Sequence, residues 1–73
     1  MTLDKLDINK KARVISINNS SIKRRLLDIG LIEGSIITSY LKSPFNDPIA
    51  YKIKNAIIAI RKCDSKEIEV ELL

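Results

Sequence analysis

Five short segments of the chain combine apolar and polar residues in the manner typical of β-strands. The clearest is the last, where Ile68, Val70 and Leu72 alternate with glutamates and so place one apolar face toward a core. The third and fourth are separated by the tight-turn candidate Lys54-Asn55, which predicts a hairpin. The predicted strands are 12–17, 35–41, 49–53, 56–61 and 67–72.

Between the first two strands, the spacing of apolar residues changes to that of a helix. Apolar residues recur at i, i+4 and i+7 with charged residues between them, which predicts a short amphipathic helix over 22–29. The polar run 18–21 offers side chains that can cap its N-terminus. Gly30 suits the left-handed position after the helix, and Leu31 can make the apolar contact that closes such a cap. The apolar face is expected to consist of Ile22, Leu26 and Ile29.

The order strand, helix, three strands, short connector and strand predicts one mostly β (α+β) domain over residues 1–73. Five short antiparallel strands favour a small closed or nearly closed barrel, because closure removes exposed strand edges. The connector 62–66 is expected to form one helical turn capped by Asp64. Leu3 and Leu6 are expected to pack under the domain.

A loop is predicted over 42–48, because this segment contains both prolines and the turn-forming pair Asn46-Asp47. It also contains Phe45, the chain's single phenylalanine. Two interpretations stay open. The ring is exposed on a rigid loop, where it can anchor a partner protein with little loss of entropy, or it folds inward and caps the barrel.

The composition limits the chemistry that this chain can perform. It has 73 residues, a net charge of +4, no histidine and one cysteine. Without histidine, the commonest general base is missing, and a lone cysteine cannot form a disulfide within the chain. Cys63 is therefore interpreted as a free thiol. Glu67, Glu69 and Glu71 are interpreted as a solvated strand face rather than a cation site. We expect neither enzymatic activity nor a bound cofactor.

The expected location is the cytoplasm. No apolar segment approaches the roughly 20 residues that span a bilayer. The opening residues lack the apolar stretch of a signal peptide. A single unpaired cysteine also suits a reducing compartment.

Basic residues crowd the first third of the chain and keep nucleic-acid binding open as an alternative function. Single-strand-binding barrels, however, stack bases on aromatic side chains, and this chain has few aromatics. A solvated basic surface is therefore favoured over a nucleic-acid site. The basic residues are Lys10, Lys11, Arg13, Lys23, Arg24 and Arg25, and the aromatic residues are Tyr40, Phe45 and Tyr51.

Four stretches of the sequence together resemble the FeoA family. The family signature is arginine-leucine, a small spacer, leucine-glycine-leucine and a further glycine, and it resembles residues 24–34 (RRLLDIGLIEG). The segment 43–49 (SPFNDPI) is similar to the family's proline-phenylalanine-glycine-aspartate-proline loop. Residues 58–61 (IAIR) and 68–70 (IEV) resemble two of its strands. The resemblance covers nearly the whole chain, with the stretches in the family's order.

The resemblance implies an SH3-like barrel without enzymatic activity that accompanies FeoB, a membrane transporter of ferrous iron. FeoB has a cytoplasmic G-protein domain, so the implied function is accessory or regulatory, by protein–protein contact with that domain. Such a protein is peripheral to the membrane at most. The same barrel forms a domain of some metal-dependent repressors, which leaves a transition-metal-responsive regulatory domain as a further alternative. Weak transition-metal binding is implied at family level, but no ligand set is visible in this sequence.

The resemblance also implies roles for individual residues. Asn9 stands, like two further asparagines, where the family commonly has glycine, and asparagine tolerates positive φ best among the other residues. Arg25 either contacts the partner or pairs locally, with Asp28 as one candidate. The implied partner-binding residues are Arg25, Pro44, Phe45, Asp47, Pro48 and Arg61, and the implied structural turns are Gly30, Gly34, Asn46 and Asn55.

Overall fold

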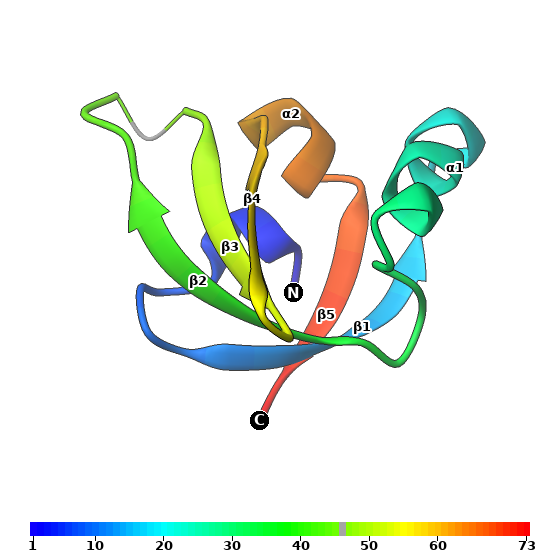
Figure 1. Cartoon of the computed structure of the whole chain (residues 1–73), viewed down its shortest axis with the longest axis horizontal. Coiled ribbons are helices and arrows are strands. Elements are labelled where there is room, and N and C mark those ends of the chain that lie inside the picture. The colour runs from blue at the N-terminus through cyan, green and yellow to red at the C-terminus, as the bar shows by residue number, and fades with distance from the viewer. Residues whose placement is uncertain (46) are drawn as a thin grey trace.

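A computed structural model describes residues 1–45 and 47–73 as one strongly curved antiparallel sheet with short helices at its margins (Figure 1). The strands follow the order β4-β3-β2-β1-β5 across the sheet. In chain order the elements are the 3₁₀ helix η1 (Leu3–Lys5), β1 (Lys11–Ile17), α1 (Ser20–Asp28), β2 (Ile36–Lys42), β3 (Ile49–Ile53), β4 (Ala56–Ile60), α2 (Lys62–Ser65) and β5 (Ile68–Leu72). The predicted five-stranded, mostly β fold with a helix after the first strand is confirmed.

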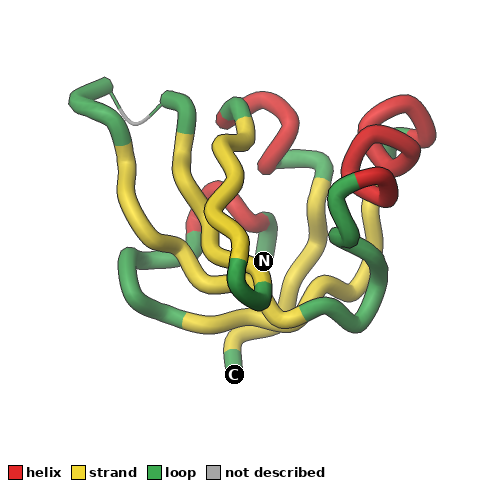
Figure 2. Tube along the Cα trace, viewed as in Figure 1, coloured by secondary structure: helices red, strands yellow, loops and turns green. Residues whose placement is uncertain are grey.

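Strand β1 pairs with β2 along its first part and with β5 along most of its length. Irregularities between Val14 and Ser16 and between Ser39 and Leu41 shift the register and bend these strands. Within the described residues β4 and β5 stay at opposite edges, so hydrogen bonding does not close the barrel. Helix α2 makes the connection between these two edges (Figure 2). Of the two predicted forms, the structure has the nearly closed one.

The core lies inside the curve of the sheet. Leu3 and Leu6, at η1, are fully buried, as predicted from the sequence. The alternating residues of β3 are buried, and in β5 the same holds for Ile68 and Val70. Leu72 is 59% exposed at the end of β5, so its predicted place on the apolar face is wrong. The helix also contributes only part of its predicted apolar face. Ile29 is 49% exposed because α1 ends one residue before it, so that prediction is wrong. The buried apolar residues are Leu3, Leu6, Ala12, Val14, Ile17, Ile22, Leu26, Leu31, Ile37, Ile49, Tyr51, Ile53, Ile60, Ile68 and Val70.

Both ends of α1 are capped as the sequence predicts. The Asn19 side chain accepts hydrogen bonds from the backbone N–H groups of the first helical turn at 3.0 and 3.2 Å. At the other end Gly30 has φ +87°, and its N–H donates to the Leu27 carbonyl at 3.0 Å. The Leu31 N–H donates to the Leu26 carbonyl at 2.9 Å, which completes a Schellman motif, and the Leu31 side chain is buried.

The turns follow the predicted glycine and asparagine positions, with one correction. Gly34 (φ +91°) and Asn9 (φ +68°) have left-handed backbones. In the β3–β4 hairpin, however, the positive φ falls on Lys54 (+53°) and not on Asn55. The pairing of Ile53 with Ala56 makes Lys54 the first central residue of the turn, where a type II′ turn requires positive φ. Asn46 lies outside the described residues.

Candidate functional site

The loop between β2 and β3 presents Phe45 to solvent with 90% of its surface exposed. Of the two interpretations of this ring, the structure therefore has the exposed one. The loop is tied together at its base. The Ser43 hydroxyl accepts from the Asp47 N–H at 2.8 Å, and the Ser43 N–H donates to the Pro48 carbonyl at 3.3 Å. Both prolines are exposed and further restrict the backbone.

Asp47 also connects this loop to α2. Its Oδ1 atom accepts a hydrogen bond of 3.0 Å from the Lys62 N–H, which is the first N–H of the helix. The N-cap residue Arg61 makes no side-chain capping bond of its own. The prediction that Asp64 caps this helical turn is wrong, because Asp64 lies inside α2 and the loop aspartate supplies the acceptor instead.

The two arginines selected from the sequence meet at Asp64. Its Oδ2 atom lies 3.2 Å from Arg61 Nε and 3.6 Å from Arg25 Nη2. The Asp64 side chain is only 15% exposed, whereas Arg25 and Arg61 are 59% and 63% exposed. The carboxylate thus lies beneath two guanidinium groups that keep further N–H donors at the surface. Asp28 is not the partner of Arg25, since α2 brings Asp64 to that position.

Beside this cluster a small groove of about 170 Å³ separates α1 from β4 and α2. Apolar residues line it together with Arg25 and Asp64, and the half-exposed Ile29 is one of them. The β2–β3 loop, α2 and α1 all lie at the upper end of the molecule in Figure 1. We call this end the loop–helix face, and define it by Arg25, Ile29, Pro44, Phe45, Asp47, Pro48, Arg61 and Asp64. The six residues that the sequence suggested for partner binding lie on the loop and helices at this end, which contacts of Asp47 and Asp64 connect through α2.

Helix α2 is also fixed from the core side. The Tyr51 hydroxyl donates to Ser65 Oγ at 3.2 Å and lies 3.4 Å from the Leu3 carbonyl oxygen. Both Tyr51 and Ser65 are fully buried. Burial raises the pKa of Tyr51 to about 12, with a further contribution from the Asp4 carboxylate, while the Ser65 hydrogen bond acts in the opposite direction. The phenol therefore stays neutral at ordinary pH and acts as a structural tie.

The basic residues of the first third of the chain do not form one continuous patch of unpaired charge. Arg13 lies 3.3 Å from Glu71, Lys23 lies 2.9 Å from Glu33, and Arg25 pairs with Asp64. Each of these three cations is therefore paired with a carboxylate. A nucleic-acid site would need them free to contact phosphate groups.

Other candidate chemistry is sparse in the part of the chain that the structure describes. There, no three His, Cys, Asp or Glu side chains gather closely enough to hold a metal ion. Cys63 is exposed. In the same described part, no helix has the length and apolarity needed to cross a membrane.

The FeoA domain family matches this chain over residues 1–72. The chain belongs to the FeoA family. Among curated relatives it is 30% identical, over its whole length, to a Porphyromonas gingivalis protein named as a fusion of Fe(2+) transport protein A and the Fe(2+) transporter FeoB. The chain spans only 9% of that fusion protein.

Solved structures of FeoA proteins have the same fold. A FeoA-like protein from Clostridium acetobutylicum is 34% identical, with a TM-score of 0.91 over 100% of this chain and 86% of that one. Stenotrophomonas maltophilia FeoA, described as a prokaryotic SH3 domain protein and solved with zinc, is 28% identical. Its TM-score is 0.83 over 97% of this chain and 89% of its own. The SH3-like prediction and the family resemblance are confirmed.

Sequence reasoning missed Asp64 as the centre of the arginine cluster. Arg61 and Asp64 are three residues apart in a possible helical turn, and this spacing could have revealed their ion pair. The contact with Arg25 depends on the packing of two helices far apart in the chain, which no local pattern encodes.

Proposed function

We propose that this chain is a non-enzymatic accessory protein of ferrous-iron transport, and that it acts by contacting the cytoplasmic G-protein part of an FeoB-type transporter. Membership of the FeoA family supports the transport role. The Porphyromonas gingivalis relative supports the choice of partner, because it joins the two proteins in one chain. On this proposal the protein works in the cytoplasm, at most peripheral to the membrane.

The observation that carries the proposal is the exposure of Phe45 on a loop whose base is held in place. Aromatic side chains that enter a pocket supply much of the energy of a typical protein interface. A loop whose base is already held loses less conformational entropy on binding than a free loop does. Phe45 therefore acts as the anchor, and Pro44, Pro48 and Asp47 keep it in position.

Arg25 and Arg61 have a different role in this proposal. Asp64 orients both guanidinium groups, but their outer N–H donors remain exposed. They are placed to contact carboxylates of the partner around the anchor. Charges at the rim of an interface act mainly on the association rate and on the choice of partner.

The test is a titration of the isotopically labelled chain with the cytoplasmic part of an FeoB-type transporter, followed by amide chemical shifts. We expect the shifts to concentrate on the loop–helix face. Phe45→Ala should weaken binding about tenfold or more, because it removes the anchor.

The matched control is Leu73→Ala, which truncates an exposed apolar side chain at the C-terminus, far from the loop in Figure 1. It should bind like the unmodified chain. Equal affinity of Phe45→Ala and the unmodified chain, or shifts concentrated elsewhere on the molecule, would contradict the proposal.

A further inference from the structure

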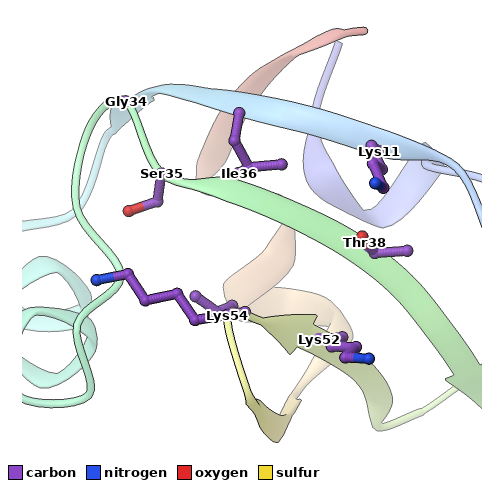
Figure 3. Close-up of a pocket in the computed structure, with 8 residues that line it drawn as sticks. Lys11, Gly34, Ser35, Ile36, Thr38, Lys52 and Lys54 are labelled. Atoms are coloured by element: carbon purple, nitrogen blue, oxygen red, sulfur yellow. The ribbon is translucent and has the colours of Figure 1, made fainter.

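A second hollow lies on the opposite side of the sheet from the core, across β1, β2 and β3 (Figure 3). Its volume is about 560 Å³, and three lysines contribute to its lining: Lys11 from β1, Lys52 from β3 and Lys54 from the hairpin turn. Thr38 and Ile36 of β2 lie between them. This basic hollow, as we call it, shares no residue with the loop–helix face.

The strand register places two of these lysines around one hydroxyl group. Lys11 pairs with Thr38, and Thr38 pairs with Lys52, so the three form a row across adjacent strands. Strands lie about 4.8 Å apart, which places the two lysine backbones roughly 10 Å from each other. Two flexible lysine side chains at this separation can reach one small anion held above Thr38.

The charge in the basic hollow is not balanced by the protein. No acidic residue lines it, and in the described part of the chain none of the three lysines lies within 4.0 Å of a carboxylate. Arg13, two residues from Lys11 on the same strand, does have such a partner in Glu71. Lys11 on β1 and Lys52 on β3 stand on either side of β2, and their positive charges repel one another across about 10 Å. An anion bound between the lysines would offset that repulsion.

Lys54 supplies an independent observation. Its φ of +53° is a strained conformation for any side chain other than glycine or asparagine. The turn alone would be less strained with glycine at this position. The Lys54 side chain extends along the edge of the hollow toward Ser35 (Figure 3). The chain thus carries a cation at the rim of the basic hollow in spite of the strain.

We propose that the basic hollow binds a phosphate-bearing ligand. Lysine is a common phosphate ligand because its ammonium group is a compact charge with three donors. The terminal oxygens of a phosphate can accept from more than one ammonium and from the Thr38 hydroxyl together. The volume falls within the range of small-molecule sites, about 300–1,000 Å³. The phosphate can belong to a soluble polyphosphate compound or to a lipid headgroup.

Two binding measurements on the full chain, both at about 0.1 M salt, distinguish these sources. In the first, inorganic tripolyphosphate is titrated into the labelled protein. In the second, the protein is sedimented with vesicles of phosphatidylglycerol and, separately, of phosphatidylcholine. Binding of tripolyphosphate without preference for the anionic vesicles indicates a soluble ligand. Sedimentation with phosphatidylglycerol vesicles but not with phosphatidylcholine vesicles indicates that the phosphate belongs to a lipid headgroup. Both results support a phosphate site if the shifts or the variants map to the basic hollow.

The decisive variant is the double substitution Lys11→Gln with Lys52→Gln, which should weaken binding at least tenfold. The matched control, Lys5→Gln with Lys66→Gln, makes the same change in net charge at exposed positions outside the hollow. It should stay within about threefold of the unmodified chain, since long-range attraction is screened beyond roughly 10 Å at 0.1 M salt. Lys54→Gly removes one charge while relieving backbone strain, so it should weaken binding without loss of stability, which urea unfolding checks.

Three results would overturn the proposal. The first is that neither tripolyphosphate nor either vesicle binds. The second is that the control pair weakens binding as much as the pair in the hollow, which would show attraction by net charge alone. The third is that the chemical shifts map to another surface. None of these results bears on transporter binding, which the loop–helix face carries.

Discussion

The loop–helix face and the basic hollow differ in whether their cations are paired with carboxylates. At the loop–helix face, Asp47 and Asp64 hold a loop and two arginines against one short helix. At the basic hollow, lysines face solvent without carboxylates beside them. Carboxylates are therefore present where they hold the loop and the arginines in place, and none lines the hollow. Substitutions at the first face should change structure, while substitutions at the second should change little except charge.

The largest effect on stability is expected at Tyr51, which fixes α2 from the core side. Its pKa is about 12 in the folded protein and 10.0 as the ordinary value, so the unfolded phenol loses its proton first as pH rises. Stability should therefore be intact below pH 10 and decline from there toward pH 12, by about 2 kcal/mol for this group. Urea unfolding at pH 8, 10 and 11 measures the decline.

Tyr51→Phe provides the comparison that isolates this group. It should lower stability by about 1 kcal/mol at pH 8, because Ser65 loses a buried hydrogen-bond partner. Above pH 10 it should also lose less stability than the unmodified chain, because all other side chains are common to both proteins. Parallel decline of the two proteins above pH 10 would show that Tyr51 does not have the raised pKa.

A smaller loss is expected at Asp47. Asp47→Ala removes the acceptor of the Lys62 N–H and should lower stability by about 1 kcal/mol. Asp47→Asn keeps an acceptor oxygen and should recover most of the loss, and Asp7→Ala serves as a control at an exposed aspartate. Thermal unfolding measures stability, and amide exchange of Lys62 reports the local contact. Slow exchange of this amide in Asp47→Ala would refute the role assigned to Asp47.

The sequence was sufficient to predict the elements of both faces but not their contacts. Period-two and helical spacing located all five strands and α1, and the polar run 18–21 and Gly30 marked the ends of α1, because these signals are local. The exposure of Phe45 was undetermined, since a lone aromatic between prolines suits either side of the chain. Arg25 and Asp64 meet only after two helices pack. The basic hollow was hidden because its row of lysines and Thr38 is set by strand register.

At the basic hollow, Lys54→Gly should not lower stability, unlike the substitutions above. Glycine adopts positive φ without strain, whereas the lysine side chain adds roughly 1 kcal/mol in this region. Part of that gain is offset because glycine makes the unfolded chain more flexible. The net result should be equal or slightly higher stability, measured by urea unfolding. A clear loss would mean that the Lys54 side chain makes a stabilising contact in the folded protein.

The smallest effects come from removing one positive charge at each face. Arg61→Gln removes an ion pair of 3.2 Å with Asp64 and should lower stability by a few tenths of a kcal/mol. Lys52→Gln removes a cation that faces Lys11 across Thr38, so it should leave stability unchanged or raise it by a similar amount. Because both effects are electrostatic and exposed, 1 M salt should bring the two variants together. A difference that persists in high salt would have to come from packing of the side chains, and the contrast in charge between the two faces would then not explain it.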